Sequence, residues 1–332
     1  MTLRPRLLAP VLAALLLSAA PTRAQDLSRR AVGTAGSAFL TIDVDPRGIA
    51  MGGAYTSVVR DAYSMYWNPA GLSQIHRAAA AAMHNEYLAG IRFQYFAGAK
   101  RISDTSVLGM AVRYMDAGSI VNRDISGNRV GTFRPRSYVY EIGWGKQIND
   151  LTDAERDVSM GVTGRWVHSD LIAHANAFAG DIGIQIHYTE SYSPYNFGLV
   201  LQNIGKGQKF DAVRDNLPFT VRLGASVWPQ PFVLLTLDGV IPIDNQPYLA
   251  MGTELKMEGP NDTNVYLRGG YNMRNQFNNL EGIRGFTVGM GLKAVNFRFD
   301  YSFVPFGILG NVHRFSVAWE LPPKRSRRFR RR

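Results

Sequence analysis

The stretch PRGIAMGGAYTSVVRDAYSMYWNPAGL, residues 46–72, differs from the rest of the chain and decides how we interpret it. Its first half is crowded with small residues, including the adjacent Gly52 and Gly53. It ends on NPAG, residues 68–71, a turn signal that stops any preceding helix. Clustered small residues indicate that backbone passes close to other backbone. We therefore predict a compact plug, with helix only between residues 58 and 67.

The chain upstream of the plug begins like an exported protein. Arg4 and Arg6 precede an apolar run over residues 7–17, and Thr22-Arg23-Ala24 resembles a cleavage site. The run is too short to span a bilayer as a stable helix. We predict a signal peptide over residues 1–24 and a lead-in and plug over residues 25–77. Within that segment, residues 38–45 are expected to be extended.

Composition narrows the class of protein further. An exported chain without cysteine has no disulfide framework, so another device must hold its fold. The net charge of +11 is concentrated at the ends, because three arginines lie in residues 1–24 and seven basic residues lie in residues 322–332. The rest of the chain is almost neutral, which argues against nucleic acid as a partner. The basic tail is either a solvated end or a contact for an anionic partner.

From residue 78 onward the sequence alternates with a period of two. Phe297, Phe299 and Tyr301 alternate with polar residues, and Phe315, Val317 and Trp319 do the same. Such strands have two different faces, which fits either a soluble sandwich or a membrane barrel. The strands are about nine to twelve residues long, as a tilted membrane strand requires, whereas sandwich strands average about five or six. We therefore favour the membrane barrel.

Counting these segments gives fourteen strands between residues 78 and 321, an even number as bacterial single-chain barrels require. The connections after odd-numbered strands are longer on average, which places them on the outer side. The longest is residues 117–136. We predict an all-β, fourteen-stranded antiparallel transmembrane β-barrel with a small N-terminal plug in the lumen. The expected strands are 78–86, 91–101, 106–116, 137–147, 157–168, 177–188, 196–203, 218–228, 232–241, 247–257, 264–272, 285–294, 296–304 and 312–321.

The run DPRGIAMGGAYTSVVRDAYSMYWNPAGL, preceded by GSAFLTI, resembles the N-terminal signature of the PorV/PorQ family of outer-membrane proteins. The motif is specific over residues 39–72, and over the barrel the resemblance rests on strand count and rhythm. More distantly the chain resembles FadL-type fatty-acid channels, which share the plug, the NPA turn and a fourteen-stranded barrel. The resemblance implies an outer-membrane location and type IX secretion, in which PorV-like members escort secreted cargo from the translocon to a surface-attachment complex.

Two groups of residues are candidates for function. In the plug, Arg47 and Asp61 either pair to pin the plug or are solvated separately, and the resemblance favours the pair. Gly52 and Gly53 either permit close packing against the wall or let the plug flex. Asn68 is expected to cap the turn. The full plug motif is Arg47, Gly52, Gly53, Asp61, Asn68, Pro69 and Ala70. The partner-contact loop carries Arg123, Arg129, Arg134 and Arg136.

Catalysis finds little support in the sequence. The six histidines lack the H-E-x-x-H spacing of a zinc site, and the nucleophile motif G-x-S-x-G does not occur. The carboxylates Asp300 and Glu320 are expected to pair with Arg298 and Arg314 rather than to act as acid and base. We assign no catalytic residue, no metal and no cofactor.

Two functions remain open. The first is a scaffold or shuttle in protein secretion and surface display, which binds secreted cargo or other secretion-system subunits through its outer loops. The second is a FadL-like channel that admits hydrophobic small molecules past the plug. A channel needs an apolar capture groove outside, whereas residues 117–136 are polar and basic. The sequence therefore favours contact with protein, in a barrel surrounded by outer-membrane lipids.

Overall fold

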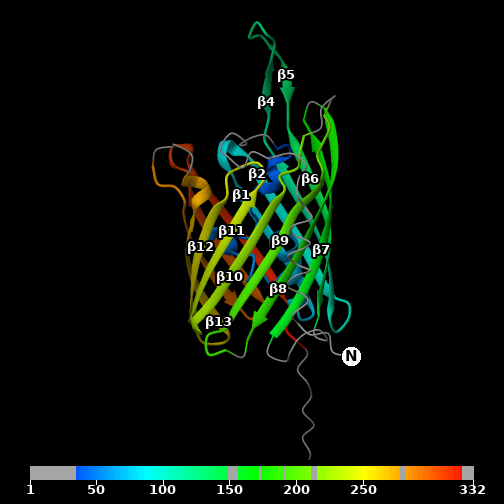
Figure 1. Cartoon of the computed structure of the whole chain (residues 1–332). Coiled ribbons are helices and arrows are strands. Elements are labelled where there is room, and N and C mark those ends of the chain that lie inside the picture. The colour runs from blue at the N-terminus through cyan, green and yellow to red at the C-terminus, as the bar shows by residue number, and fades with distance from the viewer. Residues whose placement is uncertain are drawn as a thin grey trace, which may run out of the picture.

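The structure is a computed structural model that describes residues 35–148, 156–171, 173–189, 191–210, 215–276 and 282–323. The predicted signal peptide and the basic residues of the predicted tail lie outside these ranges. Fourteen antiparallel strands close into one barrel, and β1 pairs with β16 from Ala79↔Glu320 to Glu86↔His313. Figure 1 shows the tilted strands forming the barrel wall. The predicted architecture is confirmed.

Every predicted strand overlaps one strand of the barrel, and no end differs by more than three residues. The alternation with a period of two predicted these strands because polar side chains point into the lumen and apolar side chains point to the outer surface. On β15 and β16 the outward Phe299 and Phe315 are 47% and 56% exposed, whereas the inward Asp300 and Ser316 are buried. The barrel strands are β1 (Ala78–Glu86), β2 (Arg92–Arg101), β3 (Ser106–Asp116), β6 (Arg136–Gln147), β7 (Arg156–Asp170), β8 (His174–Tyr188), β9 (Tyr195–Lys206), β10 (Thr220–Gln230), β11 (Val233–Pro242), β12 (Tyr248–Glu258), β13 (Thr263–Asn272), β14 (Phe286–Ala294), β15 (Phe297–Pro305) and β16 (Asn311–Glu320).

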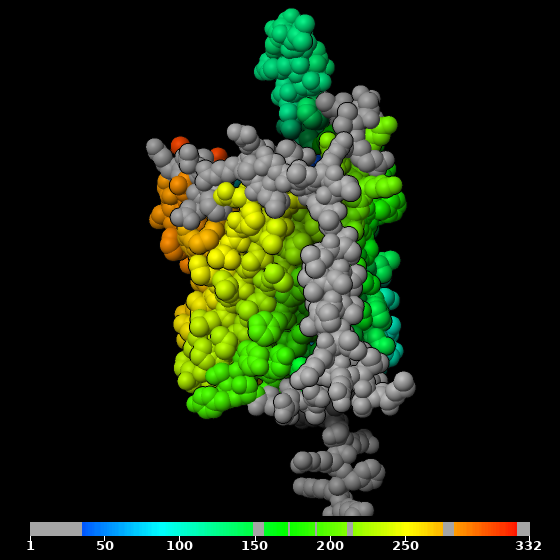
Figure 2. All heavy atoms as spheres, in the orientation of Figure 1, coloured from blue at the N-terminus to red at the C-terminus, as the bar shows by residue number. Residues whose placement is uncertain are grey.

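Two further strands were not predicted. β4 (Ile120–Arg123) and β5 (Arg129–Phe133) form a separate two-stranded sheet inside the predicted loop 117–136. This hairpin projects beyond the end of the barrel (Figures 1 and 2). We call that end, which also carries the longer connections, the outer end. Short 3₁₀ turns η5 (Leu88–Gly90), η7 (Met273–Gln276) and η8 (Gly307–Leu309) lie in its loops.

The plug fills the lumen and contains more helical turns than the sequence predicted. The helix expected within residues 58–67 is present as α3 (Ser64–Trp67), but α2 (Pro46–Ala50) was missed. Asp45 caps α2 by accepting a hydrogen bond from the Arg47 amide, and Pro46 occupies the first helical position. Ala38–Thr41 form the 3₁₀ turn η3, so the extended segment predicted over residues 38–45 is wrong at its start. A further 3₁₀ turn, η4 (Pro69–Gln74), follows α3.

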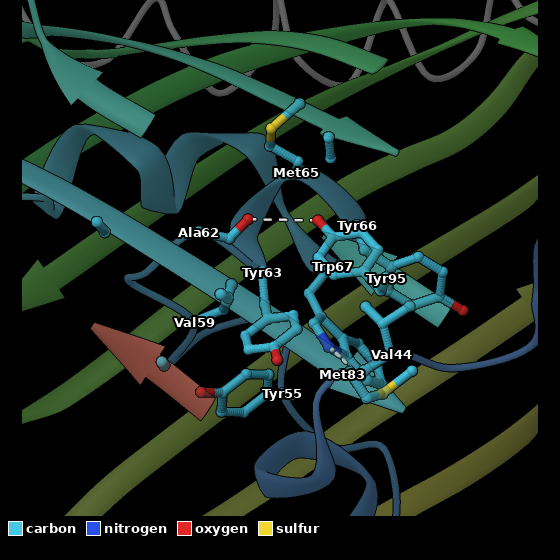
Figure 3. Close-up of a cluster of buried hydrophobic side chains, with 14 of the residues drawn as sticks. Val44, Tyr55, Val59, Ala62, Tyr63, Met65, Tyr66, Trp67, Met83 and Tyr95 are labelled. Atoms are coloured by element: carbon cyan, nitrogen blue, oxygen red, sulfur yellow. Dashed lines mark hydrogen bonds between the residues drawn. The ribbon is translucent and has the colours of Figure 1, made fainter. Parts of the chain in front are cut away.

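The aromatic side chains of the plug form the core of the molecule. Trp67 is fully buried, and its indole nitrogen donates to the Val44 carbonyl at 3.0 Å. Tyr63 stacks on Tyr95 of the wall with ring centroids 5.3 Å apart, and Tyr55 meets Trp67 edge-on (Figure 3). In the described part of the chain, no helix is long and apolar enough to cross a membrane.

Candidate functional site

The two adjacent plug glycines lie against the wall with left-handed backbone, at φ of 70° for Gly52 and 83° for Gly53. A Cβ added to Gly52 would lie 2.6 Å from the Met251 carbonyl oxygen, and one on Gly270 of β13 would lie 2.1 Å from the Gly52 nitrogen. Because only glycine tolerates both the conformation and the approach, plug and wall contact each other backbone to backbone. This contact supports close packing over flexing as the role of Gly52.

Arg47 forms its ion pair with the barrel wall and not with Asp61 of the plug. Its Nε and Nη2 donate to the two carboxylate oxygens of Glu254 on β12, both at 2.7 Å. Its Nη1 donates to the Tyr55 hydroxyl at 3.2 Å. A two-pronged guanidinium–carboxylate contact of this kind fixes orientation as well as charge. The direct pair predicted between Arg47 and Asp61 is therefore wrong.

Asp61 belongs to the same electrostatic network, but at its other end. The network runs through three wall strands and alternates in charge, in the order Arg47, Glu254, Arg268, Asp300, Arg298 and Asp61. Each step joins a nitrogen and an oxygen 2.6–2.8 Å apart. Gly291 of β14 leaves room for one step, since a Cβ there would lie 2.5 Å from Asp300 Oδ1. The plug is thus pinned at two points by charges that the wall supplies.

Of the two ion pairs predicted between side chains of the barrel wall, one is present in the structure and one is not. Asp300 accepts from Arg298 Nε at 2.6 Å, which confirms that pair. Glu320 lies at the opposite end of β16 from the outer loops and approaches His76 at 3.6 Å, so its predicted pairing with Arg314 is wrong. The lumen also holds a second buried network that was not predicted from the sequence, in which the charges alternate along Arg113, Glu141, Arg165 and Asp181. Charged residues at lumen-facing positions of the predicted strands were the available signal.

The pKa of one plug carboxyl, that of Asp45, is shifted by burial and by the charged groups around it. Burial, together with the neighbouring carboxylates of Asp61 and Asp300, raises the pKa of Asp45 to about 7. Arg298, whose Nη2 lies 4.0 Å from Asp45 Oδ1, and Arg47 act in the opposite direction. The neutral form of Asp45 is consequently favoured inside the folded plug.

Asn68 caps the turn, as predicted, because its Oδ1 accepts from the Ala70 amide at 3.1 Å. Its Nδ2 donates to the Thr56 carbonyl of the plug and to the Ile184 carbonyl of β8, both at 3.1 Å. Pro69 approaches the wall so closely that a Cβ on Gly161 would lie 2.3 Å from its carbonyl carbon. The NPA turn therefore joins the plug to the wall as well as ending α3.

The structure separates the four arginines of the partner-contact loop. Arg123 and Arg129 are exposed on the hairpin, and Arg123 Nη1 donates to the Gly127 carbonyl at 2.8 Å. Arg134 instead forms an ion pair with Asp116 at the hairpin base, and Arg136 begins β6 and is partly buried. Only the first two present their charge on the projecting part.

The hairpin also exposes apolar side chains. Ile125 at its tip is fully exposed, and Val130 is 59% exposed. Both edges of its two-stranded sheet lack a neighbouring strand among the described residues. His168 and His174 stack with ring centroids 6.1 Å apart near the same end, and no cluster of three potential metal ligands occurs in the described ranges.

Comparison with known proteins decides the family. A family model described as type IX secretion system protein PorV matches residues 24–234. The chain belongs to the PorV family. It is accordingly an outer-membrane β-barrel of that family, whose membership implies association with the secretion system, and the match indicates no enzyme family. A search of curated protein sequences found no match.

Solved structures confirm the fold of this PorV-family barrel. A FadL homologue from Pseudomonas aeruginosa matches with a TM-score of 0.52 and 8% identity, covering 83% of this chain and 98% of its own. The monoaromatic hydrocarbon channel CymD matches at 0.51 and 12%, covering 84% and 98%. The toluene transporter TodX from Pseudomonas putida matches at 0.50 and 11%, covering 82% and 95%. At such identities the likeness concerns fold alone.

Proposed function

We propose that this PorV-family barrel is a scaffold or shuttle of protein secretion and surface display, exported by the signal peptide of residues 1–24. It binds a secreted protein, or another subunit of the secretion system, through the β4–β5 hairpin. The observation that carries the proposal is the hairpin itself, because a two-stranded sheet standing outside the barrel contributes nothing to closing the wall.

The surface of the hairpin suits a protein partner. Arg123 and Arg129 provide charges for steering and Ile125 provides an apolar anchor. Its free strand edges offer backbone groups to a further strand, a common mode of peptide recognition. We therefore expect a partner that brings an extended segment and acidic side chains.

The closed lumen weighs against the alternative, a FadL-like channel for hydrophobic small molecules. The plug is anchored through Arg47 and Asp61, and Trp67 at its centre is fully buried. Passage would require these contacts to break. Transport of hydrophobic small molecules is therefore the alternative function, and it would replace the proposal if the test below fails.

The test is a chain in which residues 119–134 are replaced by a short Gly/Ser turn. Export of secreted proteins to the cell surface should fall strongly, while heat-modifiable migration on gels shows that the barrel still folds. The matched control replaces the β15–β16 loop, residues 306–310, in the same way and should secrete normally. Normal secretion by the hairpin variant would overturn the proposal.

A further inference from the structure

Three arginines surround one carboxylate on the outward face of the barrel, at the outer ends of β2, β3 and β6. In the register Asp116 of β3 lies between Arg92 of β2 and Arg136 of β6. Arg134, between β5 and β6, donates to Asp116 through Nε at 2.9 Å and also through Nη2. This two-pronged contact occupies both oxygens of the carboxylate. Asp116 therefore neutralises only one of the three guanidinium groups.

The other two arginines have no ion-pair partner in the described part of the chain. Arg92 is exposed, and Glu86 lies beside it in the register without pairing with it. Arg136 is partly buried, and its Nε is buried without a hydrogen-bond partner. The acid beside Arg136 in the register, Asp170, lies 3.2 Å from His174 Nδ1 instead. The two arginines are two strand spacings apart, about 10 Å, so their long side chains can converge on one external anion.

The outward side chains directly below these two arginines are aromatic. Tyr114 of β3 and Tyr138 of β6 are opposite each other in the register, and their ring centroids lie 5.0 Å apart. One row lower, Tyr140 stacks on Trp166 with centroids 5.4 Å apart. Tyrosine and tryptophan gather at the boundary between hydrocarbon and water. The two unpaired arginines are consequently at the level of the lipid headgroups.

An apolar groove of about 660 Å³ lies on the outer surface of the barrel, beside the same strands. Gln94, two residues after Arg92 and on the same face of β2, is part of its lining. Phe96 and Phe315 also line it and are 54% and 56% exposed. The small side chain of Ala82, opposite Phe96 in the register, leaves room between these two rings. An apolar groove next to a free cation matches an amphiphile with an anionic headgroup.

The arrangement of the two guanidinium groups favours phosphate as that headgroup. Each arginine presents a planar fork of donors, and two forks need more acceptors than the two oxygens of a carboxylate. A phosphate group offers three strong acceptor oxygens and a charge of about −1.5 to −2. It therefore accepts from both arginines at once and neutralises both.

We propose that the outward face of β1, β2, β3 and β6 binds a phosphorylated lipid of the outer leaflet, with the phosphate between Arg92 and Arg136 and an acyl chain in the groove. The ligand is of the lipid A class, a glycolipid with phosphate on its sugars. The site lies outside the barrel and involves neither the lumen nor the plug. It does not depend on the proposed contact between the hairpin and a secreted protein.

The experiment measures binding of lipid A to the full chain in detergent by native mass spectrometry. Diphosphoryl lipid A should bind at least about tenfold more tightly than the same lipid without its phosphates. The double variant Arg92→Gln and Arg136→Gln should weaken binding of diphosphoryl lipid A by about tenfold. The matched control, Lys100→Gln with Lys146→Gln, removes two exposed cations from the other ends of β2 and β6 and should bind like the unmodified protein. Heat-modifiable migration on gels checks that each variant is folded.

Equal binding of the two lipids, or unchanged binding by the arginine double variant, would overturn the proposal. Inorganic phosphate tests the other source of the same chemistry, and binding as tight as that of lipid A would reject a lipid site. Loss of secretion by the arginine double variant with unchanged binding of lipid A would assign these arginines to a protein contact instead. Ala82→Phe, which fills the groove, should weaken binding of lipid A although both arginines remain. Unchanged binding by this variant would show that no acyl chain lies in the groove and would contradict the inference.

Discussion

The most informative change to the plug anchor is Glu254→Gln. Glu254 is almost fully buried and accepts three hydrogen bonds, two from Arg47 and one from Arg268 Nε at 2.7 Å. Removing one partner of a buried ion pair typically costs about 3–5 kcal/mol, because the other charge stays buried without compensation. The matched control is Glu258→Gln on the same strand, whose side chain is 76% exposed and pairs with Lys256. Exposed pairs contribute only about 0–1 kcal/mol.

Because the chain contains no cysteine, a single introduced thiol can be labelled without background from other residues. Ser57 of the plug is fully buried and its hydroxyl has no hydrogen-bond partner, so Ser57→Cys introduces a single thiol with little disturbance. Labelling of this thiol by a maleimide reports local opening of the plug. A loss of about 3 kcal/mol should raise the labelling rate of Glu254→Gln on the order of a hundredfold, whereas Glu258→Gln should label at the parent rate. Equal rates in the two variants would refute the view that these charges anchor the plug.

Three further predictions concern the plug and its contacts with the wall. Gly270→Ala should lower the free energy of unfolding, measured with denaturant, by about 1–3 kcal/mol, because the added Cβ would clash with the Gly52 nitrogen. The control Gly98→Ala places its Cβ in open space and should cost less than about 0.5 kcal/mol. Asn68→Ala should lower the free energy of unfolding by about 0.5–2 kcal/mol through loss of the cap alone. The loss should be larger if the backbone carbonyls that accept from the Asn68 amide, such as that of Thr56, stay unpaired. Asn68→Asp keeps the cap and should recover part of this stability in the same measurement. Because the pKa of Asp45 is raised to about 7 in the folded state, its contribution to stability is complete below about pH 4 and is lost as the pH rises through 7. Asp45→Asn should remove this pH dependence from the unfolding curve, and an unchanged curve would contradict the assignment.

The barrel could be predicted from the sequence because each strand carries its own signal. The alternation at Phe297, Phe299 and Tyr301 reflects a lumen on one side and lipid on the other, and it does not depend on distant residues. The β4–β5 hairpin escaped prediction because it is exposed on every side and therefore shows no alternation. The helix α2 escaped because Gly48 and Pro46 read as turn residues, and only its cap at Asp45 and its packing against the wall make it helical.

The partners of the plug charges could not be predicted for a different reason. Arg47 binds a residue 207 positions away, and Asp61 binds Arg298 at 237 positions. Such pairings depend on which strands the closed barrel brings opposite the plug, and no local pattern encodes that. Recognition of the plug motif identified the family, but the wall determines how the plug is held.

The central claim is that the outer hairpin contacts a secreted protein. Its most direct test is a photo-crosslinking amino acid at Ile125, the fully exposed hairpin tip, in cells that are secreting. The control places the same group at Met290, which is 56% exposed on the outward face of β14. We predict crosslinks from position 125 to a secreted protein or a secretion-system subunit, and none to these proteins from position 290. Crosslinks to lipid alone at position 125, in cells that secrete normally, would contradict the account.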